Sequence, residues 1–234
     1  MSTKIKLNNG KFLAMAALAL SLILIFQGGV SGQEASTATY EIVFESTWSP
    51  QTHPFVGFPS NEHYSPLIGA THNDAMVFWE VGGFATDGIE LMAETGGTSD
   101  LRDEVDDAIN NGMADQIVSG TGMSSSPSSI SIDSITVSSD FPNLTLVSMI
   151  APSPDWFIGV GSLSLQDDDD QWINTLEVPL FPYDAGTEEG DTYSLNNDPT
   201  NPQEAISRIA GQSPFSEEPL GMFIITRLNQ PDPT

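Results

Sequence analysis

The chain has 234 residues, no cysteine, and 32 acidic against six basic side chains, which gives a formal net charge of −26. The absence of cysteine excludes a disulfide framework and thiol chemistry, and so negative a chain cannot neutralise nucleic-acid phosphates. The acidity has two interpretations: a surface that stays solvated in salty surroundings, or a set of ligands for cations.

The N-terminus has the layout of a secretory signal peptide. Lys4, Lys6 and Lys11 precede a run from Phe12 to Phe26 that is apolar except for Ser21, and small residues follow up to Gly32. The apolar run is shorter than the roughly 20 residues with which a helix spans a bilayer. We expect residues 1–32 to be cleaved near Gly32, so that the protein is secreted with no membrane insertion after cleavage; an uncleaved anchor is the alternative.

The rest of the chain predicts one domain, residues 39–230, after a short disordered lead at 33–38. Apolar and polar residues alternate from Tyr40 to Phe44, as in a half-buried strand. Two alternating pairs, at 130–132 and 135–137, have opposite phase, which predicts a bulge at 133–134. Further strands are expected at Met76–Val81, Leu144–Ile150, Phe157–Leu165, Trp172–Leu180 and Met222–Leu228, and loops at Ser119–Ser129 and Asp191–Gln203.

One helix is expected between the strands. Ser99 is a candidate N-cap, three acids follow in the first turn, and apolar residues then share one face until Gly112. A shorter helical turn is expected around Ile89–Glu94. Many short strands with one inserted helix favour an all-β fold, an antiparallel β-sandwich.

Several segments, in this order, resemble the spondin domain, the calcium-binding domain of F-spondin and mindin. They are TYEIVFESTWSP with HP at 53–54, YSPLIGATH at 64–72, FWEVGGFATDGI at 78–89, LMAETG at 91–96, PSPDWFIGV at 152–160 and YDAGTEEGDTY at 183–193. The resemblance runs from about Thr39 to Ile209 and implies an antiparallel sandwich that resembles a C2 domain. Two differences stand out: the animal relatives carry cysteines, and Glu188 and Glu189 replace the usual D-S of the family motif.

The resemblance implies a calcium site at Asp155, Asp184 and Glu188. Ca²⁺ prefers six to eight oxygen ligands from carboxylates, backbone carbonyls and water, which these residues and the carbonyls near Gly186 can supply. In so acidic a chain, however, two loop acids by themselves usually mark solvated surface. The run Asp167–Asp170 has the same two interpretations, a second ion site or a solvated turn, and it lacks the ligand spacing of an EF-hand.

Three histidines, His53, His63 and His72, lie within twenty residues and could hold a zinc ion with an open position for water. Their spacing matches no zinc signature, and no G-x-S-x-G nucleophile motif is present. The sequence therefore favours a non-enzymatic calcium-binding module that engages an extracellular protein or glycan. A metal-dependent hydrolase using the histidines is the alternative, and a structural envelope protein with calcium as a folding staple is a third.

Overall fold

A computed structural model describes residues 36–229, and the expected signal peptide and residues 33–35 of the expected lead lie outside these residues. The described residues form two antiparallel sheets and two helices. In chain order the elements are β1 Thr37–Ser46, β2 His63–Tyr64, β3 Ile68–His72, α1 Asp87–Thr95, α2 Ser99–Asn110, β4 Ala114–Ser119, β5 Ser128–Ser138, β6 Asn143–Ala151, β7 Trp156–Ser164, β8 Thr175–Leu180, β9 Tyr183–Asp184, β10 Ser207–Arg208 and β11 Gly221–Arg227.

The smaller sheet has the strand order β5-β1-β11-β8 and one buried face. Every second side chain of β1 is buried, because successive side chains of a strand point to opposite faces. The register between β1 and β5 shifts between Tyr40 and Ile42, opposite residues 133–134. The bulge expected from the change of phase is therefore confirmed.

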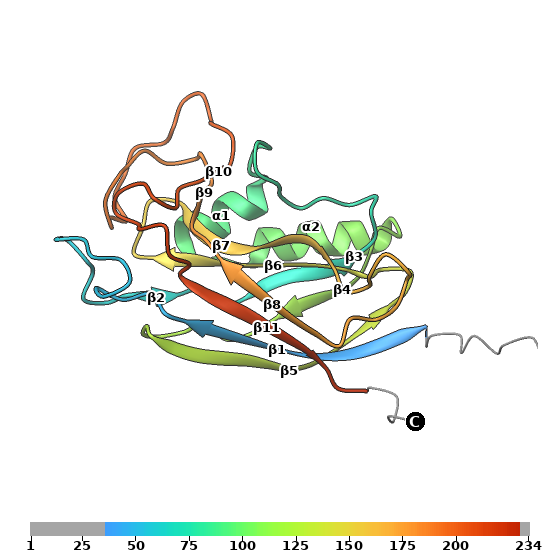
Figure 1. The fold of residues 1–234 in the computed structure, drawn as a ribbon. Coiled ribbons are helices and arrows are strands. Elements are labelled where there is room, and N and C mark those ends of the chain that lie inside the picture. Colours follow the sequence, from blue (N-terminus) through green and yellow to red (C-terminus); the bar gives the residue numbers. More distant parts are fainter. Residues whose placement is uncertain (1–35, 230–234) are drawn as a thin grey trace, which may run out of the picture. The chain divides into compact units, whose positions relative to one another are not determined.

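The larger sheet has the order β10-β9-β7-β6-β3-β4, and β2 also pairs with β6. Both faces of its central strand β6 are covered, so all nine residues of β6 are buried. One face packs against the smaller sheet, and helices α1 and α2 lie over the other, as Figure 1 shows. The fold is the expected all-β sandwich, with a second apolar core between the larger sheet and the helices.

The helices differ in detail from the expectation. The expected turn at Ile89–Glu94 is a nine-residue helix, α1, whose N-cap is Thr86. Helix α2 begins one residue after its N-cap Thr98, so the expectation that Ser99 caps this helix is wrong; the Ser99 hydroxyl donates instead to Asp100. Neither helix, nor any other within residues 36–229, is long and apolar enough to cross a bilayer.

The prediction of a strand at Met76–Val81 is wrong, because this segment is an irregular loop that packs on the larger sheet. Phe78 and Trp79 are adjacent and both buried, which a strand with one exposed face does not allow. The Trp79 ring lies 5.0 Å, centroid to centroid, from the ring of Phe157, and its indole nitrogen donates to Val160 O. Tertiary packing of the aromatic rings thus accounts for the apolar run.

Other boundaries shift by a few residues. Strand β1 begins at Thr37, inside the expected lead, and the strand expected from Trp172 begins only at Thr175. The strands at β6, β7 and β11 are confirmed to within one residue at each end. Strands β2, β3, β4, β9 and β10 were not predicted, and the shortest of them have two residues each.

Candidate metal site

Asp155 lies in the turn between β6 and β7, at one end of the larger sheet. The backbone N–H of Trp156 donates to the hydroxyl of Ser153 at 3.2 Å, which closes this turn. The carbonyl of Asp155 accepts from Ala185 N–H, next to the pairing of Trp156 with Asp184. The turn and strand β9 are thereby held together, so the two predicted aspartates lie close to each other.

The Asp155 side chain is completely buried. Its Oδ2 accepts three hydrogen bonds, from Thr187 N at 2.7 Å, Glu188 N at 3.1 Å and the Thr187 hydroxyl at 3.2 Å. Its Oδ1 is buried and has no hydrogen-bond partner. Burial raises the pKa of this carboxyl, and the bonds from Thr187 and Glu188 oppose the rise. One oxygen thus organises the loop, and the other makes no hydrogen bond.

Asp184, in strand β9, is partly buried beside Asp155. Its Oδ1 accepts from Gly186 N at 2.8 Å, and its Oδ2 accepts from the indole nitrogen of Trp156 at 3.2 Å. Desolvation first, and then the negative charge of Asp155, raise the pKa of Asp184 to about 6. The structure therefore confines two like charges in a poorly solvated place, a free-energy cost that a cation would remove.

Gly186 shapes the loop that reaches Asp155. Its φ of +76° lies in the left-handed region, and a Cβ there would come within 2.3 Å of Glu204 O. Its carbonyl accepts from Glu204 N at 2.9 Å. Only glycine fits both the angle and the space, and the resulting turn aims the next two N–H groups at Asp155 Oδ2.

Glu188 and Glu94 complete the acidic surroundings. Desolvation raises the pKa of Glu188, with a further contribution from the charge of Asp155, while a hydrogen bond from Asn197 opposes the rise. Glu94, in the last turn of α1, has a pKa raised by desolvation and by the charges of Glu188, Glu90 and Asp155, against a hydrogen bond from Thr187. Sequence reasoning missed Glu94, although it lies in the segment LMAETG that carries the resemblance.

The side chains around Asp155 and Asp184 can be compared with the ligands that a cation requires. Within residues 36–229, no three His, Asp or Glu side chains are already arranged as a coordination shell. The carboxylates of Asp155, Asp184, Glu188 and Glu94 nevertheless act on one another, and no basic group is among the causes of their pKa shifts. An orphaned buried oxygen and uncompensated carboxylates fit a hard cation with oxygen ligands. Small side-chain movements would have to complete the shell.

The other candidate groups lie elsewhere. Asp167–Asp170 form an exposed turn in which Asp167 Oδ1 accepts from the backbone N–H groups of Asp169 and Gln171. The three histidines are not brought together as a metal site.

Each histidine has its own neighbours. His53 Nδ1 accepts from Ser216 N at 3.2 Å, and His72 Nε2 lies 2.8 Å from the hydroxyl of Thr145. The Nδ1 atom of the third, His63, lies 2.7 Å from the carbonyl oxygen of Asn61. Desolvation lowers the pKa of both His53 and His72, which favours neutral rings that serve in packing.

Comparison with known proteins agrees with the motifs. The Spondin_N family model matches residues 38–230. Spondin-2 of Homo sapiens is 32% identical over 233 residues, which cover 90% of this chain and 66% of that protein. Spondin-1 of Gallus gallus is 32% identical over 196 residues, 76% of this chain, and Spondin-1 of Homo sapiens is 32% identical over 187 residues. The aligned part is only 23% of either Spondin-1. On these matches the chain belongs to the spondin family.

Proposed function

We propose that this protein is a secreted, calcium-binding domain without enzymatic activity, used for adhesion or for association with an extracellular surface or matrix. Asp155 and Asp184 supply the principal carboxylates, and Glu188 and Glu94 supply further oxygens or compensating charge. The partner is an extracellular protein or glycan. Calcium holds the turn after β6 and the loop after β9 together and so fixes that end of the sandwich.

The observation that carries the proposal is the Oδ1 atom of Asp155, a completely buried carboxylate oxygen without a hydrogen-bond partner. Leaving such an atom unsatisfied costs about 1–3 kcal/mol or more. Neighbouring acids add negative charge around it, because the charge of Asp155 raises the pKa of both Asp184 and Glu188. A bound cation removes both the unsatisfied oxygen and the repulsion.

Calcium is favoured over magnesium by the irregularity of the donor set. The carboxylates come from a turn, a short strand, a loop and a helix end, at Asp155, Asp184, Glu188 and Glu94. Ca²⁺ accepts six to eight oxygens in flexible geometry, whereas Mg²⁺ requires a near-ideal octahedron and retains its water. We therefore expect a weaker response to magnesium.

A zinc hydrolase built on the histidines is not favoured. His53 and His72 are buried and engage Ser216 and Thr145 respectively, and a catalytic zinc needs an open position for water or substrate. The binding-module proposal stands on the acidic site instead.

The calcium proposal is tested by thermal unfolding in calcium and in chelator, at high and constant ionic strength so that general screening is equal. We expect calcium at a hundredfold excess over Kd to stabilise the wild type by about 2.7 kcal/mol. Asp184→Asn should lose most of this stabilisation. The matched control Asp140→Asn, which removes an exposed acid in a turn, should keep it.

An identical calcium response in wild type and Asp184→Asn would refute the site. A response that magnesium reproduces at equal concentration would refute the calcium preference. Zinc that copurifies stoichiometrically and disappears on substitution of the histidines would favour the hydrolase.

Secretion is tested separately by mass spectrometry of the secreted fraction. We expect a mature N-terminus between about Gly32 and Ser36, because the apolar run ends before the small residues that suit a cleavage site. Recovery of the uncleaved chain in the membrane fraction would establish the anchored alternative.

A further inference from the structure

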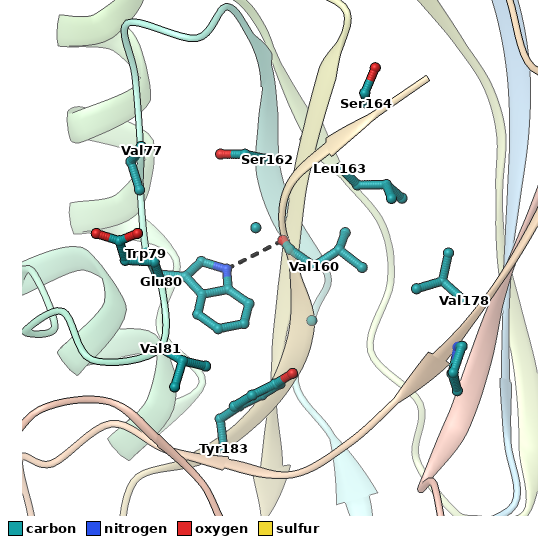
Figure 2. Close-up of a pocket in the computed structure, with 13 residues that line it drawn as sticks. Val77, Trp79, Glu80, Val81, Val160, Ser162, Leu163, Ser164, Val178 and Tyr183 are labelled. Atoms are coloured by element: carbon teal, nitrogen blue, oxygen red, sulfur yellow. Dashed lines mark hydrogen bonds between the residues drawn. The ribbon is translucent and has the colours of Figure 1, made fainter. Parts of the chain in front are cut away.

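A groove lies along strand β7. Figure 2 shows its two walls, the segment Val77–Val81 on one side and Val178 of β8 on the other, with residues 159–164 of β7 between them. Tyr183 lies at one end. The groove has a volume of about 570 Å³, within the range of pockets that bind small ligands or a few residues of peptide.

The groove lies where both sheets have an edge. Strand β8 is the last strand of the smaller sheet, and β7 pairs with β9 only at Trp156 and Phe157. Sheet edges are common docking sites for extended peptides, which add main-chain contacts along them. These edges are partly blocked, because Pro179 of β8 has no N–H and Trp79 already donates to Val160 O. Side chains must therefore supply most of the binding.

One wall of the groove carries exposed apolar side chains on either side of the exposed acid Glu80. Val77 and Val81 of this wall are 51% and 58% exposed, and Phe84, three residues after Val81, is 64% exposed. They are three of the six large apolar side chains that stand out as exposed in residues 36–229, and all three lie on one short loop. Apolar side chains gathered in this way on an acidic, well-solvated surface mark a contact surface.

A cation with free donors stands at the Tyr183 end. All lysines lie before residue 12, so the described residues contain only three basic side chains besides histidine. Arg227 is buried, and Arg102 donates to Thr98. Arg208 is exposed, its guanidinium carbon lies 3.7 Å from the ring centroid of Phe181, and no carboxylate of residues 36–229 pairs with it. Stacking on an aromatic ring orders the guanidinium and leaves its donors available.

Two observations place Arg208 at the groove. Arg208 and Tyr183 are direct partners across β10 and β9, so their side chains share one face of the sheet. The ring of Phe181, on which the guanidinium stacks, lies two residues before Tyr183 in the chain.

We propose that this groove docks the C-terminal segment of a partner protein, with apolar side chains against the Val77–Val81 and Val178 walls and the terminal carboxylate on Arg208. The inference rests on the proposed binding role of the domain, and not on calcium. Arg208 is an exposed cation at one end of a groove with valine side chains on both walls, which is complementary to an apolar ligand with one anionic end; Glu80 lies on the Val77–Val81 wall.

A second copy of the chain is disfavoured as the occupant, because two chains of net charge −26 repel each other. A glycan is disfavoured because Trp79 is only 7% exposed and so offers no ring face, while the exposed side chains Val77 and Val81 are apolar. A neutral or basic partner with an apolar C-terminus fits the groove and is not repelled by the negative charge of the chain.

The test is a titration of the isotopically labelled protein, in calcium, followed by NMR of backbone amides. The probe is N-acetyl-threonyl-valyl-leucyl-valine with a free carboxylate, compared with the same peptide as its C-terminal amide. We expect saturable shifts at Gly159, Gly161 and neighbouring amides, with the amide peptide binding roughly tenfold more weakly because it loses a charge-assisted contact.

Arg208→Gln should lower the affinity for the carboxylate peptide by the same factor and leave the affinity for the amide peptide unchanged. The matched control Arg102→Gln, on α2, should change neither affinity. Val81→Ser should lower the affinity for both peptides. Equal affinities of the two peptides for the wild type, shifts that map away from the groove, or no saturable binding would each overturn the proposal. Calcium-dependent melting is a separate readout, so the failure of either proposal is distinguishable from the failure of the other.

Discussion

Two acidic regions of this molecule contain similar numbers of carboxylates and have different surroundings. Asp167–Asp170 is a fully exposed turn, in which Asp167 Oδ1 accepts from two backbone N–H groups and water reaches every side chain. Asp155 is completely buried, and Asp184 beside it is partly buried. Burial is what turns a group of acids into a candidate ion site, because water and salt screen charges on an exposed turn but leave them unscreened inside the domain.

The largest expected effect comes from truncating the buried acid. Asp155→Ala removes the acceptor of three hydrogen bonds from Thr187 and Glu188, and leaves buried donors unpaired. We expect a loss of about 3 kcal/mol in the free energy of unfolding measured in chelator by chemical denaturation. Asp155→Asn, which keeps an acceptor oxygen for the loop, should lose less but should no longer respond to calcium.

The corresponding change in the exposed turn is Asp167→Ala, which removes an acceptor from solvated N–H groups. Its cost should be below about 1 kcal/mol, because water replaces the lost bonds. Similar losses for the two alanine variants would contradict the difference in burial on which the comparison rests.

A smaller effect is expected from pH. The pKa of Asp184 rises from its ordinary value of 3.8 to about 6, through burial and then the charge of Asp155. Between these values the folded protein binds a proton that the unfolded chain does not, so in chelator the stability should increase as pH falls from above 6 towards 4. The gain should be roughly 2 kcal/mol. Asp155, Glu188 and Glu94 shift in the same direction.

Chemical denaturation in chelator between pH 4.5 and 7.5 measures this dependence. Neutralising the acidic surface also stabilises the fold as pH falls, so the informative quantity is the difference between wild type and Asp184→Asn. Wild type should have the steeper slope, and with calcium bound the slope should diminish or reverse, since protons and calcium compete. Equal slopes in chelator would exclude a buried, repelled Asp184.

The sequence carried the local periodicities and the motif segments, and these were sufficient for the sandwich, for strands β6, β7 and β11, and for the bulge opposite Tyr40. It could not place segments whose conformation is set by tertiary contacts. The run Met76–Val81 has the composition of a strand, but Trp79 and Phe78 are buried by packing on the larger sheet rather than by pairing. Two-residue strands such as β9 have no periodicity to detect.

For the candidate site, the resemblance supplied Asp155, Asp184 and Glu188. In the fold they are near enough that the charge of Asp155 raises the pKa values of the other two. It did not supply Glu94, which lies about sixty residues earlier in the chain and reaches the site only because α1 packs on β6 and β7. It also gave no sign of the groove, whose walls come from a loop mistaken for a strand and from the edge of the other sheet.

The smallest expected effect is that of removing charge from the exposed turn. Asp168 and Asp169 are exposed, and Asp167 satisfies the backbone of the turn, so the double substitution Asp168→Asn and Asp169→Asn leaves the hydrogen bonds of Asp167 in place. The run offers no buried, unpartnered oxygen to an ion, and calcium near it would remain hydrated and screened. We therefore expect calcium to raise the melting temperature of the double variant as much as that of the wild type, and isothermal calorimetry to give the same stoichiometry. A loss of one bound calcium per chain would show that the exposed turn binds an ion of its own. Burial would then not decide which of the two acidic regions binds calcium.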